Sequence, residues 1–218
     1  MKKFVAVVSL LLGASSFSHA AVVMPKGDAD AGQGKSAVCA ACHGADGNSA
    51  APNFPKLAGQ NAKYLYKQLQ NFKSGARQNA LMMPMATALN DQDMADISAY
   101  YAQQKGTIGG AKKDLVERGQ KLYRGGDKEI GLTACSGCHG PAGKGNEFAA
   151  FPRLSGQHAE YTATQLRHFR AAGRDDLTDE KRNNDGSKPG ELGPMQMIAA
   201  KLSDKDIEAL ASYIQGLH

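Results

Sequence analysis

The sequence predicts an all-α protein built from two tandem copies of one helical unit. Three observations predict this fold class. Apolar residues recur at helical spacing in both halves, and no stretch alternates convincingly as a strand. In addition, the segment FPKLAGQ at residues 54–60 recurs as FPRLSGQ at residues 151–157, which indicates an internal repeat.

The repeat extends over polar positions as well as apolar ones. In the middle of each half, the pairs matched with identical spacing are Tyr64 and Tyr161, Gln68 and Gln165, and Phe72 and Phe169. Near the end of each half they are Leu89 and Leu202, Asp91 and Asp204, Asp93 and Asp206, and Tyr100 and Tyr213. A shared helical pattern alone would not reproduce the polar residues, so we infer a duplication.

Each copy is expected to contain three helices around a loop. In the first copy they cover roughly residues 30–41, residues 62–74 and a segment after Asn90, whose side chain can cap the helix with Asp93 three residues on. In the second copy the first helix is expected to start near residue 114. The pair Ser203 and Asp206 repeats the capping device there.

The domain boundaries follow from the glycine-rich segment at residues 105–111, which cannot hold a helix. We expect a first domain at residues 21–105, a linker at 106–113 and a second domain at 114–218. The second copy also carries extra polar residues between positions 174 and 193, which predict a solvated surface loop.

The first 20 residues are expected to be a signal peptide. Lys2 and Lys3 precede an apolar stretch at residues 4–12, and Ser18 and Ala20 supply the small residues that a signal peptidase reads. Nothing after Ala20 is apolar for long enough to span a membrane. The sequence therefore predicts a periplasmic protein that is exported with cleavage of residues 1–20.

All four cysteines fall in two Cys-x-x-Cys-His motifs, at residues 39–43 and 135–139. This motif is the attachment signature of haem c, whose vinyl groups react with the two thiols while the adjacent histidine reaches the iron. The sequence therefore predicts two covalently attached haem c groups. The expected attachment residues are Cys39, Cys42, Cys135 and Cys138, and the expected iron ligands are His43 and His139.

Two other uses of the cysteines are weaker. A disulfide within each pair would leave the following histidine unexplained twice. A structural zinc ion would need four convergent ligands, and pooling both pairs would join the two repeats through one ion.

The sixth iron position is expected to be filled by a methionine, a soft donor that raises the reduction potential. Met82 lies seven residues before Leu89, and Met195 lies seven residues before Leu202. No other methionine pair keeps this register, so Met82 and Met195 are the predicted ligands. The competing choices are Met83 in the first copy and Met197 in the second.

Other side chains leave alternatives open. His158 and His168 occupy positions that hold Asn61 and Asn71 in the first copy, so surface or helix-face roles are favoured over a second haem with two histidine ligands. The axial histidines also need a partner for the other ring nitrogen, and the carbonyl of Pro55 or Pro152 is one candidate. Four tyrosines could either reach the haem carboxylates or only pack in the core: Tyr64, Tyr161, Tyr100 and Tyr213.

The formal net charge of +5 falls with the loss of Lys2 and Lys3 and with the carboxylates that two haems add. No basic cluster is interleaved with aromatics, so we expect no nucleic-acid partner.

Taken together, these motifs resemble class I cytochromes c and, over essentially all of the expected mature chain, the dihaem cytochrome c4 family. The resemblance implies two tandem all-α cytochrome c domains, each wrapped around a covalent haem and related by a pseudo-twofold, with the haems facing one another. It implies one haem held by Cys39 and Cys42 with His43 and Met82 axial. The other is held by Cys135 and Cys138 with His139 and Met195 axial.

The expected function is that of a monomeric respiratory electron carrier rather than an enzyme. A quinol-oxidising complex or a dehydrogenase would be the donor, and the resemblance implies a terminal oxidase as acceptor and, in some members, loose membrane association. One alternative is the electron-accepting subunit of a larger dehydrogenase such as a flavocytochrome. A dihaem peroxidase is a weaker alternative, because two matched methionines would close both irons.

Overall fold

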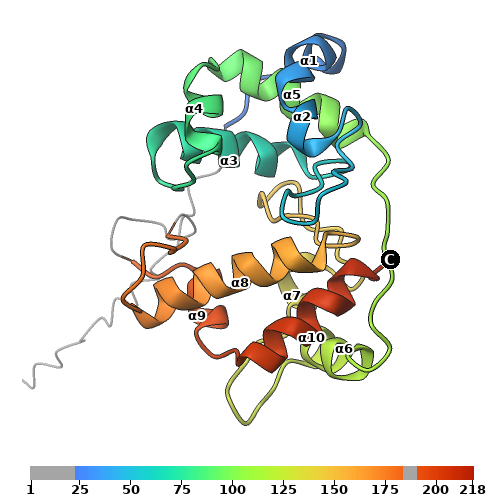
Figure 1. The fold of residues 1–218 in the computed structure, drawn as a ribbon, viewed down its shortest axis with the longest axis vertical. Helices are drawn as coiled ribbons and strands as arrows, with labels where there is room; N and C mark the ends of the chain where they lie inside the picture. The colour runs from blue at the N-terminus through green and yellow to red at the C-terminus, as the bar shows by residue number, and fades with distance from the viewer. Residues whose placement is uncertain (1–22, 184–190) are drawn as a thin grey trace, which may run out of the picture.

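The computed structural model describes residues 23–183 and 191–218, which form two helical domains stacked on one another (Figure 1). The regular elements in this part of the chain are helices, accompanied only by two isolated β-bridges in the C-terminal half. The predicted all-α fold is confirmed. The expected signal peptide at residues 1–20 lies outside the described residues.

Corresponding helices follow one another in the same order in the two halves. The N-terminal half contains α1 (Ala29–Lys35), the 3₁₀ turn η1 (Ser36–Val38), α2 (Ala40–His43), α3 (Ala62–Ser74), α4 (Met82–Thr87) and α5 (Asp91–Gln103). The C-terminal half contains α6 (Val116–Gly125), α7 (Ser136–His139), α8 (Ala159–Arg174), α9 (Pro194–Ala199) and α10 (Asp204–Gln215).

The single helix predicted over residues 30–41 is wrong. The chain leaves α1 after Lys35, passes through η1 and makes a separate turn, α2, that contains most of the first cysteine motif. The start predicted near residue 114 shifts to Val116. The helix predicted over residues 62–74 coincides with α3. The short helices α4 and α9 were not predicted, because six-residue segments carry too little periodicity.

The predicted caps of the last helix in each half are confirmed. The Asn90 side chain accepts a hydrogen bond from the backbone N–H of Asp93, and the Asp93 carboxylate accepts one from the N–H of Asn90. Ser203 and Asp206 form the same box at the start of α10. Each cap fixes where its helix begins and contributes about 1 kcal/mol.

The first and last helices of each half cross at a glycine. A Cβ atom added to Gly32 of α1 would collide with the carbonyl oxygen of Asp96 in α5, and one added to Gly119 of α6 would collide with that of Ala209 in α10. Only glycine permits this approach of two backbones. The crossing fixes α5 and α10, against which α3 and α8 pack.

Each domain core contains a fully buried tyrosine, which comes from the last helix of the N-terminal half and from the first helix of the C-terminal half. Tyr101 of α5 is fully buried in the N-terminal half and belongs to the cluster that packs against Cys39. Tyr123 of α6 is fully buried in the C-terminal half and belongs to the cluster that packs against Cys135. An aromatic side chain therefore lies beside the first cysteine of each motif, although the sequence positions differ.

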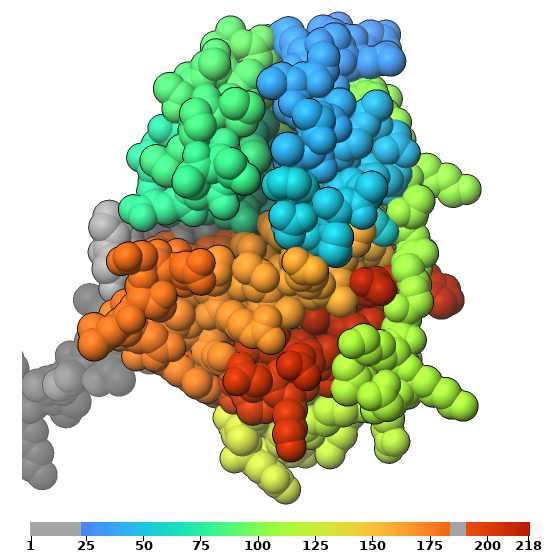
Figure 2. Space-filling view, in the orientation of Figure 1, coloured from blue at the N-terminus to red at the C-terminus, as the bar shows by residue number. Residues whose placement is uncertain are grey.

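The segment that joins the domains has no helix, as its glycines predicted, and it is fixed to both halves. The N–H of Thr107 donates to the side chain of Asn48 at 2.8 Å, and the N–H of Gly109 donates to the carbonyl of Gln215 at 3.0 Å. Figure 2 shows the two halves in direct contact along a broad surface. Their relative placement therefore does not depend on the linker alone.

The solvated loop predicted between residues 174 and 193 is only partly correct. Most of residues 175–181 are exposed, but Arg182 is 7 % exposed and its guanidinium lies against the other domain. Residues 184–190 lie outside the described residues.

Candidate haem-binding sites

The first cysteine motif occupies one turn of helix. The N–H of His43 donates to the carbonyl of Cys39 at 3.0 Å, so both cysteines and the histidine lie within a single turn. Cys39 packs against the buried cluster of Leu65, Ile97 and Tyr101, whereas Cys42 is exposed. The same turn recurs at the second motif, where the N–H of His139 donates to the carbonyl of Cys135 at 3.0 Å.

Both motif histidines are buried and oriented by a proline carbonyl. Nδ1 of His43 donates to the carbonyl oxygen of Pro55 at 2.9 Å, and Nδ1 of His139 donates to that of Pro152 at 3.0 Å. The expectation that these carbonyls orient the rings is confirmed. With Nδ1 carrying the proton, Nε2 is the nitrogen that can bind a metal.

Burial favours the neutral imidazole at both sites. Each motif histidine is 6 % exposed. Burial lowers the pKa of His43 and His139, and the proline carbonyls oppose this shift only in part. The neutral ring is the form that binds iron, so the sites are poised to ligate at neutral pH.

The donor set fits haem c and does not fit zinc or a disulfide. No disulfide joins the cysteines of either motif, and the second cysteine of each pair is exposed. Among residues 23–183 and 191–218, no three His, Cys, Asp or Glu side chains converge in a way that could hold a metal ion. Two thiols with one oriented imidazole are what covalent haem attachment requires.

Burial also affects the first thiol of each motif before it reacts with haem. It raises the pKa of Cys39, and it raises the pKa of Cys135 to about 11. The first cysteine of each motif therefore packs against the protein interior, whereas the second is exposed.

The methionines differ in how far they reach into the domains. In the C-terminal half, Met195 is half-buried and packs against the cluster that also contacts Cys135, whereas Met197 is 50 % exposed. This placement favours Met195 over Met197. In the N-terminal half, Met82 and Met83 are both half-buried in the first turn of α4. Ligation by Met82 and Met195 stays a prediction.

The two remaining internal histidines have other contacts. Nε2 of His158 donates to the carbonyl oxygen of Ser49 in the other domain at 2.9 Å and lies 3.0 Å from the Ser49 hydroxyl. Nε2 of His168 lies 3.6 Å from the carboxylate of Glu180. These contacts favour an interface role for His158 and a helix-face role for His168.

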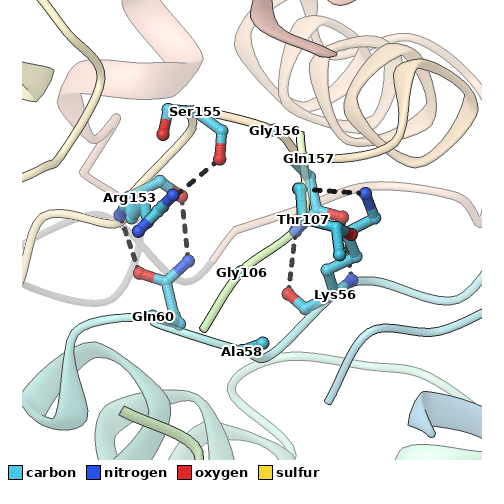
Figure 3. Close-up of a pocket in the computed structure, with 9 residues that line it drawn as sticks. All are labelled: Lys56, Ala58, Gln60, Gly106, Thr107, Arg153, Ser155, Gly156 and Gln157. Atoms are coloured by element: carbon cyan, nitrogen blue, oxygen red, sulfur yellow. Dashed lines mark hydrogen bonds between the residues drawn. The ribbon is translucent and has the colours of Figure 1, made fainter. Parts of the chain in front are cut away.

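The segments that orient the histidines also join the two domains (Figure 3). Nε2 of Gln60 donates to the carbonyl of Arg153 at 2.9 Å, and the N–H of Arg153 donates to Oε1 of Gln60 at 2.7 Å. Gln157 makes the same pair of bonds to Lys56, both at 2.9 Å. Lys56 and Arg153 directly follow the two prolines, so the histidine supports are part of the domain interface.

The sequence did not predict that two arginines, Arg77 and Arg182, lie at the domain interface. The N–H of Arg77 donates to the carbonyl of Asn71, and the N–H of Arg182 donates to that of His168, the equivalent residue. The arginines are therefore structural counterparts. The extra residues after α8 move Arg182 out of register, which hides the match. Arg174, and not Arg182, lies as far from Phe169 as Arg77 lies from Phe72, so the repeat alone points to the wrong arginine.

Comparisons with known proteins agree with this geometry. A family model described as cytochrome c matches residues 29–105 and 116–218. The chain is 52% identical to cytochrome c4 from Azotobacter vinelandii over the full length of both proteins. Its structure matches the crystal structure of reduced recombinant cytochrome c4 from Pseudomonas stutzeri with a TM-score of 0.78 and 53% identity, covering 88% of this chain and 100% of the other.

A further relative carries a different name. The chain is 41% identical to a thiosulfate dehydrogenase electron acceptor from Stutzerimonas stutzeri, over 80% of this chain and 76% of the relative. Together with the two motifs, the matches show two covalent haem c groups, one at Cys39 and Cys42 and one at Cys135 and Cys138.

Proposed function

Because this chain belongs to the dihaem cytochrome c4 family, an electron-transfer family and not an enzyme family, we propose that it carries electrons in the periplasm to a terminal oxidase. The observation that carries the proposal is the equivalence of the two sites. Each has a buried histidine oriented by a proline carbonyl, and each has a methionine in the same register.

The proposed ligands leave no position for a substrate. His43 and Met82 would close one iron, and His139 and Met195 would close the other. When bound, haem supplies an iron that alternates between the ferrous and ferric states. The protein's part is to hold the histidine rings neutral and oriented, to exclude water and to keep the two sites in one rigid unit.

Export is part of the proposal. We infer cleavage after Ala20, which would leave a mature protein that begins at Ala21. In the part of the chain that the structure describes, no helix is long and apolar enough to cross a membrane. Mass spectrometry of the purified protein tests the cleavage, because the mass should equal residues 21–218 plus two haems. Retention of residues 1–20 would contradict it.

Oxidation by membranes tests the acceptor. Reduced protein is mixed with membranes of the source organism, and the loss of its ferrous absorption is followed with and without cyanide. Rapid, cyanide-sensitive oxidation supports donation to a terminal oxidase. The hypothesis would be contradicted if cyanide did not slow the oxidation. It would also be contradicted if an unrelated soluble cytochrome c of different net charge were oxidised as fast.

The relative from Stutzerimonas stutzeri favours a second candidate function, electron acceptance from a dehydrogenase. Oxidised protein is mixed with a thiosulfate dehydrogenase and thiosulfate. Reduction at a rate that saturates with the concentration of this protein would support that role. Both results together would place the chain between a dehydrogenase and an oxidase.

A further inference from the structure

Two arginines and two glutamines from the two domains form a closed ring at the interface. Arg77 donates through Nη1 to Oε1 of Gln68 and through Nη2 to Oε1 of Gln165, both at 2.8 Å. Arg182 donates to the same two oxygens, to Gln165 at 2.8 Å and to Gln68 at 3.1 Å. Each glutamine oxygen therefore accepts from one arginine of its own domain and one of the other.

Each arginine also crosses to a tyrosine of the opposite domain. Nη2 of Arg77 donates to the hydroxyl of Tyr161 at 3.0 Å, and Nη2 of Arg182 donates to that of Tyr64 at 3.1 Å. Tyr64 and Tyr161 are matched residues of the repeat, so the pseudo-twofold relation of the domains extends to this ring.

The ring adjoins the walls of both haem sites. The guanidinium of Arg77 lies 4.6 Å from the ring centroid of Phe72, and that of Arg182 lies 4.4 Å from that of Phe169. Phe169 belongs to the buried cluster that packs against Cys135 and Met195. Phe72 is buried on α3, which packs against α4, the helix of the predicted first methionine ligand.

Charges in this position act on both domains. Arg182 is almost completely buried, and water screens a buried charge far less than an exposed one. Burial alone raises the pKa of Tyr64, but Arg182 and then Arg77 outweigh it, so that the pKa is lowered overall. A positive field that stabilises a phenolate also stabilises a ferrous iron against a ferric one, because reduction lowers the positive charge of the site.

We propose that this ring is a shared electrostatic element in which each arginine raises the reduction potentials of both haems. Each domain thereby sets part of the potential of the iron held by the other domain. The proposal deepens the electron-carrier function and rests on the two haems, which both candidate functions share, and not on the identity of the redox partner. Arg77 and Arg182 act through their charge in this proposal, since neither is a predicted iron ligand.

A redox titration of the purified dihaem protein tests the proposal. Two midpoint potentials are fitted to the optical titration of the parent protein, of Arg77→Gln and of Arg182→Gln. We expect both potentials to fall in each variant. A change in only one potential, or in neither, would overturn the shared role. Lys121→Gln is the control, because it removes the same charge from the exposed face of α6 and should leave both potentials unchanged.

A conservative variant separates charge from geometry. Arg77→Lys keeps the positive charge but lacks the planar fork that bonds two oxygens. Its potentials should lie closer to those of the parent than to those of Arg77→Gln. Equal shifts in the two variants would show that the hydrogen bonds, and not the charge, set the potentials, and would overturn the proposal. If the parent protein shows two midpoint potentials but is not oxidised by membranes, that result refutes only the oxidase hypothesis.

Discussion

Gln60 of the N-terminal domain and Arg153 of the C-terminal domain are joined by two hydrogen bonds, side chain to backbone in both directions. The side-chain amide of Gln60 thus satisfies both the N–H and the carbonyl of Arg153, as the backbone of a neighbouring strand does in a sheet. Because Pro152 directly precedes Arg153, the bond that orients His139 is carried by a segment that the other domain holds in place.

Loss of this contact should weaken the protein. Gln60→Ala leaves the N–H and carbonyl of Arg153 without these partners, which should lower the free energy of unfolding by about 1–3 kcal/mol. Gln157→Ala should cost a similar amount through Lys56. Thermal unfolding followed by circular dichroism measures both. Gln103→Ala, at the exposed end of α5, is the control, and equal losses in all three variants would count against the clamp.

The helix crossings predict opposite effects for two glycines of α1. Gly32→Ala places a methyl group against the backbone of Asp96 and should destabilise by about 1–3 kcal/mol or more. Gly34→Ala meets no atom within 4 Å and should stabilise by about 0.5–1 kcal/mol, since alanine is the better helix former. Denaturant unfolding compares them. Destabilisation of equal size by both substitutions would contradict the crossing.

Acid should weaken the contact between α6 and α10. Burial raises the pKa of Asp206, but hydrogen bonds from Ser203 and Arg118 outweigh it and lower the pKa below the usual value. A lowered folded-state pKa adds stability that is present above the unfolded-state pKa of about 3.9 and is lost as pH falls through the folded-state value. Asp206→Asn should flatten the fall in stability below about pH 4. An unchanged slope would show that other carboxylates carry it.

The methionine assignment predicts a difference between neighbours on α9. Met195→Ala should lower the potential of one haem by on the order of 0.1 V, well within the range of about 0.8 V that axial ligands set. Met197→Ala removes an exposed side chain and should leave both potentials unchanged. A redox titration measures both variants. The reverse pattern would move the ligand to Met197.

The repeat made most of the fold and the cysteine sites predictable. It is strong where both copies keep the same spacing, as at Gln60 and Gln157 or at the caps of α5 and α10. It failed where one copy carries an insertion, which hid the relation of Arg77 to Arg182. The repeat also does not show that one helix can supply a core residue in one copy and another helix in the other. The fully buried Tyr101 and Tyr123, on different helices, were therefore not matched.

The break of the first predicted helix has a physical cause that the sequence pattern does not show. No proline interrupts residues 30–41, yet the chain makes a 3₁₀ turn at residues 36–38 before the cysteine motif. The motif then forms its own turn, with His43 directed to the Pro55 carbonyl. That contact comes from a segment outside the predicted helix, and a local sequence pattern does not show such contacts.

Carbon monoxide titration of the reduced, purified protein tests the central claim most directly, because the gas binds only to a ferrous iron with an open or displaceable sixth position. We expect that neither haem spectrum changes, since the proposed ligands His43 and Met82 would close one iron and His139 and Met195 would close the other. Binding to either haem of the parent protein would contradict a carrier with two closed irons.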